Sequence, residues 1–284
     1  MIQGTTRLIA HIGYPTETFK SPLIYNPYFM KNHIDAVVVP MGCKSDSYRE
    51  FLPLLFKLSN MHGALITMPH KTVTVELLDI PSKAVLVAGA CNAVRPGPRG
   101  ELIGDLFDGE GFVRGVKRKG FPLEGLRALV IGSGGAGSAI AASLANANIH
   151  ELAVFDANPE MMKRLAERLG SHYPALRVLE GSDDPSGFDL VVNATPLGMK
   201  DDDPLPLDVG RLEPRTFVGE VVMKREETPL IAAARAKGCM TQIGLDMLFE
   251  QIPAYLEFFG FPSATSDELR EIYDGGDGPK SANL

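Results

Sequence analysis

A glycine-rich loop between an apolar run and a helix-forming run is the feature that most constrains this chain. Residues 128–131 (ALVI) have the composition of a buried strand, and a run of small residues typical of a helix follows the loop. Between them, Gly132, Gly134 and Gly137 have the spacing G-x-G-x-x-G. This pattern alone is a weak signal, but a strand, such a loop and a helix in that order are typical of a dinucleotide-binding unit.

Each glycine of this loop has an expected role. Gly132 makes the turn, Gly134 lets the backbone approach a pyrophosphate, and Gly137 permits close packing of the helix on the strand. Free N–H groups and the dipole at the helix N-terminus favour an anion there. The alternative is a glycine-rich turn without a ligand. The residues that we expect around the pyrophosphate are Gly132, Ser133, Gly134, Gly135, Ala136 and Gly137.

The acidic residue after the next strand indicates which dinucleotide binds. Residues 151–155 (ELAVF) form a second predicted strand, and Asp156 follows it. A carboxylate at this place hydrogen-bonds a free ribose 2′-hydroxyl and repels a 2′-phosphate. No arginine stands in the adjacent turn, and Lys163 and Arg164 are expected to be solvated charges of the following helix. The sequence therefore predicts NAD rather than NADP as the cofactor.

Composition excludes several other classes of function. The chain has 284 residues and a formal net charge of −7, which argues against nucleic acid or an anionic membrane as the main partner. No run of about 18 apolar residues exists, and the first residues lack the pattern of a secretory signal. Three scattered cysteines suit a reducing compartment. We expect a cytoplasmic globular protein, monomer or homodimer, with a small-molecule substrate.

Metal and nucleophile chemistry has no support in the sequence. The six histidines show neither an H-E-x-x-H pattern nor Cys/His metal spacing, so we predict no metal. No serine or cysteine nucleophile motif is present. His70 lies beside Lys71 and should point to the opposite side if the preceding strand continues.

Alternating strand and helix patterns before the glycine loop predict a second α/β domain. Three strands are expected at 6–12, 34–39 and 64–67, with a helix at 45–60. Residues 91–95 and 101–106 flank a turn cluster and predict a hairpin. Strand–helix–strand alternation implies mostly parallel pairing. The predicted fold class is α/β with two domains, a substrate domain with a mostly parallel sheet and a Rossmann-type nucleotide-binding domain.

Domain boundaries follow from these patterns. We expect residues 1–110 to form the substrate domain and 111–244 the Rossmann domain, with helices at 245–272 returning to the first. Pro253 should kink or break the helix expected at 245–259. The Gly/Asp/Ser-rich segment 273–284 is expected to be a flexible tail.

Two ionisable residues of the first domain are candidates for proton transfer. Lys71 follows the strand at 64–67, at the carboxyl end where α/β sheets place ligands, and Asp108 stands just before the second domain. A lysine can exchange a proton with a substrate hydroxyl, and a nearby carboxylate would orient it. Without further context, an isolated lysine or aspartate is usually a surface residue.

The order of motifs resembles the shikimate and quinate dehydrogenases over nearly the whole chain up to about residue 260. Seven segments in the family's order carry the resemblance. They are Gly13-Tyr14-Pro15 with Lys20-Ser21-Pro22, Thr67-x-Pro69-x-Lys71, Gly89-Ala90-Cys91-Asn92, Asp108-Gly109, Asn193-Ala194-Thr195-Pro196-Leu197-Gly198-Met199, Thr228-Pro229-Leu230, and Gly244-x-x-Met247-Leu248-x-x-Gln251.

The resemblance implies reversible hydride transfer between a nicotinamide and C3 of a cyclic hydroxy acid. Lys71 would exchange the proton of the C3 hydroxyl, with Asp108 paired to it. Ring hydroxyls would be bound by Asn92, Thr67 and Gln251, and the carboxylate by Ser21. The nicotinamide side would be lined by Asn193, Ala194, Thr195, Pro196, Val221 and Gly244.

Four departures from the family pattern fall among the expected substrate contacts. Phe19 stands where the family has a serine that binds the substrate carboxylate, and Leu65 replaces an asparagine. Leu106-Phe107 replaces the Asn-Thr before the catalytic aspartate, and Met223 replaces a tyrosine. These changes remove hydrogen-bonding groups and add apolar volume, so we expect a remodelled pocket around a retained Lys71–Asp108 pair. The alternative for each change is neutral drift compensated nearby.

Three functions remain open on this evidence. The first is an NAD-dependent dehydrogenase that interconverts shikimate, or a close analogue, and 3-dehydroshikimate. The second is a dehydrogenase of quinate or another cyclic hydroxy acid, with a more apolar pocket. The third, from a different class, is a dinucleotide-binding sensor without turnover, against which the retention of Lys71 and Asp108 argues.

Overall fold

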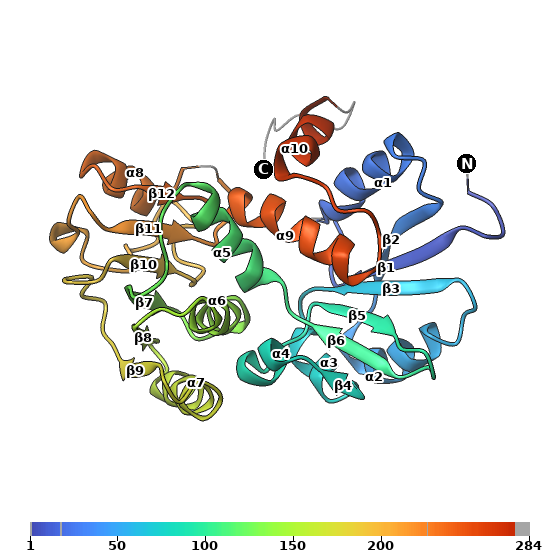
Figure 1. Ribbon diagram of the computed structural model, residues 1–284, viewed down its shortest axis with the longest axis horizontal. Helices are drawn as coiled ribbons and strands as arrows, with labels where there is room; N and C mark the ends of the chain where they lie inside the picture. The colour runs from blue at the N-terminus through green and yellow to red at the C-terminus, as the bar shows by residue number, and fades with distance from the viewer. Residues whose placement is uncertain (1, 18, 226, 276–284) are drawn as a thin grey trace. The chain divides into compact units, whose positions relative to one another are not determined.

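The computed structural model describes residues 2–17, 19–225 and 227–275. The chain divides into two compact units (Figure 1). Among the described residues, one unit consists of the chain up to Phe107 together with residues 252–275, and the other consists of Asp108–Gln251. Within the described residues, no helix combines the length and the apolar character needed to cross a membrane.

The first unit contains a six-stranded sheet in the order β2-β1-β3-β5-β6-β4. All neighbouring pairs are parallel except those of β5, which runs antiparallel to β3 and β6. This agrees with the predicted mostly parallel sheet, and the β5–β6 pair is the predicted hairpin. The strands are β1 Arg7–Gly13, β2 Ala36–Gly42, β3 Met61–Ile66, β4 Ile80–Pro81, β5 Ala93–Pro96 and β6 Leu102–Asp105.

The helices of the first unit are short. They are α1 Ser21–Lys31, α2 Ser45–Leu55, α3 Lys71–Val75, α4 Lys83–Ala88 and α10 Ser266–Gly275. Helix α4 has a Ser82 cap, whose side chain accepts from the Val85 N–H, and ends at Gly89 with φ +66°. The predicted helix 45–60 is five residues too long, because a turn replaces it after Leu55.

The second unit contains a parallel six-stranded sheet in the order β12-β11-β10-β7-β8-β9. Numbered from β7, this is the doubly wound order 3-2-1-4-5-6 of a Rossmann fold, so the predicted fold class is confirmed. The strands are β7 Arg127–Ile131, β8 Glu151–Phe155, β9 Arg177–Glu180, β10 Leu190–Asn193, β11 Phe217–Glu220 and β12 Thr241–Gln242.

The helices of the second unit begin at residues that favour helix starts. Asn158 is the N-cap of α7, and its side chain accepts from the Glu160 and Met161 N–H groups. Thr228 is the N-cap of α8, and its side chain accepts from the Ile231 N–H. A proline follows each cap as the first helical residue. The helices are α5 Asp108–Arg118, α6 Gly135–Asn146, α7 Pro159–His172, the 3₁₀ turn η1 Val209–Arg211 and α8 Pro229–Ala236. Helix α9, Gly244–Phe258, belongs to this unit as far as Gln251 and to the first unit from Ile252 on.

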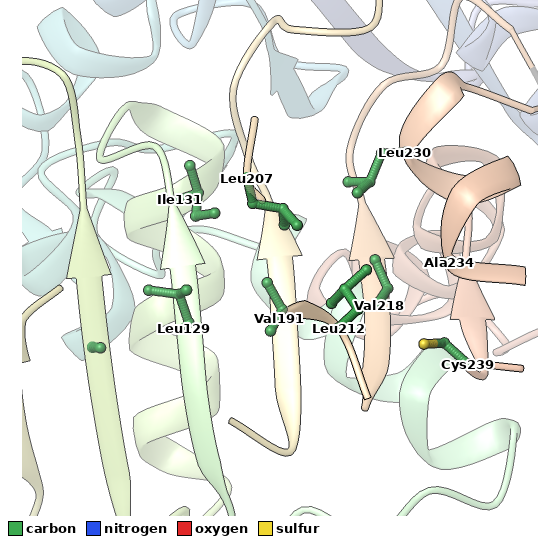
Figure 2. Packing of buried hydrophobic residues seen from close by; sticks show 10 residues of the cluster. Leu129, Ile131, Val191, Leu207, Leu212, Val218, Leu230, Ala234 and Cys239 are labelled. Carbon is green, nitrogen blue, oxygen red and sulfur yellow. The ribbon is translucent and has the colours of Figure 1, made fainter. Parts of the chain in front are cut away.

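One face of the second sheet buries an apolar cluster (Figure 2). Leu129 and Ile131 of β7, Val191 of β10 and Val218 of β11 meet Leu230 of α8 in it. Consecutive members on β7 are two residues apart, as expected when alternate side chains of a strand point to the same face. The cluster fixes the central strands whose carboxyl ends carry the nucleotide loop.

The unit boundaries differ from those drawn on the sequence. Residues 108–110 and 245–251, assigned to the first domain by the sequence analysis, belong to the second unit. Close packing within that unit explains the difference. A Cβ on Gly109 would lie 2.0 Å from the Ala139 carbonyl oxygen of α6, and a Cβ on Gly111 would lie 2.5 Å from the Gln251 Cβ of α9.

The C-terminal segment contacts helix α1 and strand β3 of the first unit. The Tyr28 hydroxyl of α1 donates to the Pro262 carbonyl at 3.0 Å, and His62 of β3 donates to the Phe259 carbonyl at 2.6 Å. A Cβ on Gly63 would lie 2.3 Å from the Phe259 ring, so β3 needs glycine there.

The structure bears in part on two expectations about the C-terminal residues. Helix α9 continues through Pro253 rather than breaking at it. The proline lacks an N–H to donate, but the helix backbone remains helical on both sides. Residues 273–275 of the predicted flexible tail belong to α10, and residues 276–284 lie outside the described residues.

Candidate functional site

One row of register partners crosses the first sheet near its candidate site. His11 of β1 is opposite Leu65 of β3, Leu65 is opposite Ala93 of β5, and Ala93 is opposite Asp105 of β6. Partners in register point to the same face of a sheet. The row therefore sets an imidazole, two apolar side chains and a carboxylate on one face.

Lys71 lies beside this row rather than on a strand. Strand β3 ends at Ile66, and Lys71 is the first residue of the short helix α3, so the strand does not continue as the expectation for His70 assumed. The Lys71 carbonyl accepts from the Cys91 N–H at 2.8 Å. Burial lowers the pKa of His11, and the nearby Lys71 charge lowers it further. Burial raises the pKa of Cys91, and the Lys71 charge opposes this increase. Lys71 therefore lies close to both side chains.

His70 is held away from the site by its own contacts. Its ring stacks on Tyr48 at a centroid distance of 3.9 Å, and its Nε2 donates to the Cys43 carbonyl at 2.8 Å. Burial lowers its pKa, and the bond to Cys43 opposes this. His70 is therefore a structural residue that anchors the turn before Lys71.

Asn92 presents an unused hydrogen-bond donor. Its side chain is 1% exposed, and its Oδ1 accepts from the Phe107 N–H at 2.9 Å. Its Nδ2 has no hydrogen-bond partner in the described part of the chain. A buried amide without a partner costs about 1–3 kcal/mol, which a bound hydroxyl would relieve. This fits the predicted role of Asn92 in substrate binding.

Thr67 and Ser21 stand at the ends of their elements. Thr67 follows β3, and its N–H donates to the Ile12 carbonyl at 2.9 Å. A Cβ on Gly13 would lie 2.4 Å from the Thr67 Cγ2, so glycine is needed where β1 ends. Ser21 is the first residue of α1 and is half-buried, followed by Pro22.

The apolar replacements occupy different surroundings. Leu65 and Leu106 are buried. The Phe107 ring meets Tyr255 and Phe258 edge-on at centroid distances of 5.0 and 5.4 Å, so it packs against α9. Phe19 is half-buried and its ring stacks on His11.

Sequence reasoning did not assign a role to His11 or Asp105. Asp105 accepts from the Ser82 hydroxyl at 2.6 Å and from the Leu106 N–H at 2.8 Å. Burial is the main cause of the raised pKa of Cys91, and the Asp105 charge raises it further. The sheet register that aligns both residues is a long-range property, and no local signal could have found them.

The glycine loop of the second unit has the geometry that a pyrophosphate needs. Gly132 has φ +103°, and a Cβ on Gly137 would lie 1.8 Å from the Gly132 carbonyl oxygen. In contrast, a Cβ on Gly134 or Gly135 would meet no atom within 4 Å. The loop is therefore tight where it turns and open at the start of α6, where Ala136 follows and N–H groups are free for an anion.

Two further observations support dinucleotide binding by this loop. The Ser133 hydroxyl is buried and has no hydrogen-bond partner among the residues described. The Asp156 carboxylate accepts from the Ser133 N–H at 2.6 Å and from the Asn158 N–H at 2.8 Å. These bonds place a fixed carboxylate beside the loop, as the predicted ribose contact requires.

The segment after β10 is fixed by a buried carboxylate that the sequence analysis did not identify. Glu220 is 1% exposed and accepts from the Asn193 Nδ2 at 2.8 Å and from the Thr228 hydroxyl. Burial raises its pKa, and the bonds from Thr228 and Asn193 oppose this. Asn193 in turn accepts from the Thr195 hydroxyl at 2.7 Å, so Glu220 holds the loop that contains Ala194, Thr195 and Pro196.

The other predicted residues of the second unit differ in burial and in their neighbours. A Cβ on Gly244 would lie 2.4 Å from the Val222 carbonyl and 2.9 Å from the Val221 carbonyl, so Gly244 and Val221 lie together. Met223 is exposed. Asp108 begins α5 and is buried, and Gln251 of α9 is buried with its Oε1 unpaired in the described residues. The pairing of Asp108 with Lys71 remains a prediction.

Comparison with known sequences identifies relatives along the chain. A family model described as the shikimate dehydrogenase substrate binding domain matches residues 11–94. The shikimate dehydrogenase (NADP(+)) of Acidiphilium cryptum is 33% identical over 271 residues, which cover 95% of this chain and 96% of that protein.

Solved structures match this chain over nearly its whole length. The shikimate 5-dehydrogenase from Listeria monocytogenes, solved in complex with shikimate and NAD, has a TM-score of 0.88 and 27% identity, covering 95% of this chain and 97% of that chain. The quinate dehydrogenase from Corynebacterium glutamicum in complex with NAD has a TM-score of 0.84 and 28% identity, covering 95% of this chain and 99% of that chain. The sequence identity and its coverage show that the chain belongs to the shikimate dehydrogenase family.

Proposed function

We propose that the chain is a dehydrogenase that transfers hydride between a nicotinamide dinucleotide and a ring hydroxyl of shikimate or another cyclic hydroxy acid. The observation that carries the proposal is the unpaired Nδ2 of Asn92. Asn92 follows Cys91, whose N–H donates to the Lys71 carbonyl. A buried donor next to a residue that can exchange protons is what a hydroxyl-bearing substrate requires. The open glycine loop supports dinucleotide binding in the other unit.

In the proposed reaction, the dinucleotide supplies the acceptor or donor of the hydride. Lys71 exchanges the proton of the reacting hydroxyl at its Nζ atom. Asn92 and Thr67 hold the hydroxyls of the ring, and Asp108 orients Lys71, as the family resemblance implies. A dinucleotide-binding sensor needs neither Lys71 nor the unpaired Asn92, so we favour the enzyme.

We propose NAD as the preferred cofactor. The Asp156 carboxylate, fixed by two N–H groups, can accept from a ribose hydroxyl and would repel a 2′-phosphate. Its relatives differ in this respect, since the Acidiphilium cryptum protein is named for NADP(+) and the Listeria monocytogenes structure contains NAD. The ratio of kcat/KM for NAD and NADP tests the proposal, and a preference for NADP would contradict it.

The second candidate substrate that we propose is quinate or another cyclic hydroxy acid. Phe19 and Met223 stand where the family has a serine and a tyrosine, and Phe19 adds an aromatic ring beside the Lys71 site. Loss of hydroxyl groups from a pocket changes discrimination between polar substrates by large factors. Initial rates of NAD reduction with shikimate, with quinate and with the methyl ester of each acid would rank the candidates. Absence of NADH formation with all of them would favour the sensor.

A further inference from the structure

His11 is a buried titratable group that the proposed reaction does not use. It is 8% exposed, and its Nδ1 has no hydrogen-bond partner within the described residues. Its register partner is Leu65, so its side chain shares the sheet face of Asp105. An unpaired buried nitrogen is costly, and proteins rarely leave one without a ligand or a structural reason.

Phe19 fixes the orientation of the His11 ring. The two rings stack with a centroid distance of 3.9 Å and an interplanar angle of 21°. A Cβ on Gly13, two residues along the same face of β1, would lie 2.9 Å from the Phe19 Cζ. Phe19 is therefore wedged between the end of β1 and the imidazole, and it forms an aromatic wall on one side of this ring.

The imidazole is uncharged near neutral pH. Burial, and then the Lys71 charge, lower the pKa of His11 to about 4. A neutral imidazole offers one N–H donor and one lone pair, which match a hydroxyl because a hydroxyl both donates and accepts. It supplies no charge to balance a carboxylate, whose desolvation against Phe19 would be unfavourable.

We propose that His11 is a specificity-determining residue of the Lys71 site, and that its imidazole hydrogen-bonds an uncharged hydroxyl of the substrate beside the Phe19 wall. This inference rests on the proposed function, since it assigns a substrate group to the same site. The site then combines two kinds of recognition. Lys71 acts on the reacting hydroxyl, and His11 selects a second, uncharged one.

The test compares two substitutions at the same position. His11→Val keeps a side chain of moderate size without hydrogen-bonding groups, and His11→Asn restores an amide near the place of Nδ1. With NAD saturating and shikimate or quinate varied, we expect His11→Val to raise KM roughly 3- to 10-fold and to leave kcat within about twofold. His11→Asn should recover most of the KM, and the KM for NAD should not change.

A matched control separates this role from a structural one. His62→Val removes a half-buried histidine of the same unit, which donates to the Phe259 carbonyl, and should leave the KM for the acid unchanged. The proposal is overturned if His11→Val leaves KM unchanged, or if His11→Asn is no better than His11→Val while both variants remain folded.

A binding measurement distinguishes this failure from that of the proposed function. Calorimetric titration of shikimate and quinate into the NADH-bound protein requires no turnover. If the wild type forms no NADH but binds either acid, with a Kd that His11→Val raises and His11→Asn restores, the proposed function fails and the role of His11 stands. If the wild type binds neither acid, both proposals are contradicted.

Discussion

The two units prepare their sites in different ways. The nucleotide unit uses backbone geometry, with Gly132 in a left-handed turn, Gly137 against the strand and open positions at Gly134 and Gly135. The substrate unit uses side chains, among them Lys71, Asn92 and His11, which come from separate elements. A short local sequence motif determines a site built from the backbone. A site built from side chains depends on sheet register and changes with single substitutions.

Substitution of Lys71 should have the largest effect, and it should affect turnover without affecting NAD binding. We expect Lys71→Met to lower kcat roughly 10²- to 10⁴-fold, because it removes the group that exchanges the substrate proton. The Kd for NAD should remain within about twofold, since the dinucleotide loop belongs to the other unit. Lys83→Met, at an exposed lysine of the same unit, is the control. Equal rates for both variants would refute the assignment of Lys71.

Substitution of Gly137 tests the backbone site. A Cβ there would lie 1.8 Å from the Gly132 carbonyl oxygen, so Gly137→Ala should lower the free energy of unfolding by about 3 kcal/mol and weaken NAD binding. Gly170→Ala is the matched control, because nothing lies within 4 Å of its Cβ position in α7. That variant should gain about 0.5–1 kcal/mol. Urea unfolding and NAD titration measure both, and similar stabilities would contradict the account.

The pH dependence of stability tests the burial of His11. Its pKa falls from 6.5 to about 4 on folding, so the unfolded chain binds the proton more readily. The free energy of unfolding is therefore unaffected by this group above pH 6.5 and decreases as the pH falls from 6.5 toward 4. Between pH 7.5 and pH 5, the wild type should lose about 2 kcal/mol more than His11→Val does. Urea unfolding at both pH values measures this, and parallel losses would show that His11 is exposed.

The smallest predicted effect concerns cofactor choice. Asp156→Ala should lower the ratio of kcat/KM for NAD over NADP roughly tenfold, because a charged hydrogen bond to the ribose is lost and repulsion of a 2′-phosphate is relieved. Lys163→Ala and Arg164→Ala should leave the ratio unchanged. A change in those variants, with none in Asp156→Ala, would assign the choice to the basic residues of α7.

The sequence predicted the nucleotide unit better than the substrate unit. Strand 151–155 is found with its predicted bounds, and the predicted Rossmann-type fold appears, because apolar runs and glycines are local signals. Lys71 follows β3, as expected, but the short helix α3 that it begins was not predicted. Pro253 was expected to kink or break its helix, and α9 continues through it without a break, since packing can override a local propensity.

The residues missed by the sequence analysis share a physical cause. His11 and Asp105 lie in one row only because β1, β3, β5 and β6 pair in a specific register. Glu220 becomes a buried anchor because Asn193 and Thr228 meet it from two other segments. None of these arrangements has a local pattern, so the fold is needed to see them. The glycine loop needed no such information.

Cofactor reduction by the purified wild-type protein tests the central claim most directly. The protein would be incubated with NAD or NADP and with shikimate or quinate, and formation of the reduced cofactor would be followed by absorbance. The account predicts NADH formation with at least one of the two acids and a kcat/KM for NAD above that for NADP. No reduction with either acid by a protein that binds NAD would contradict it.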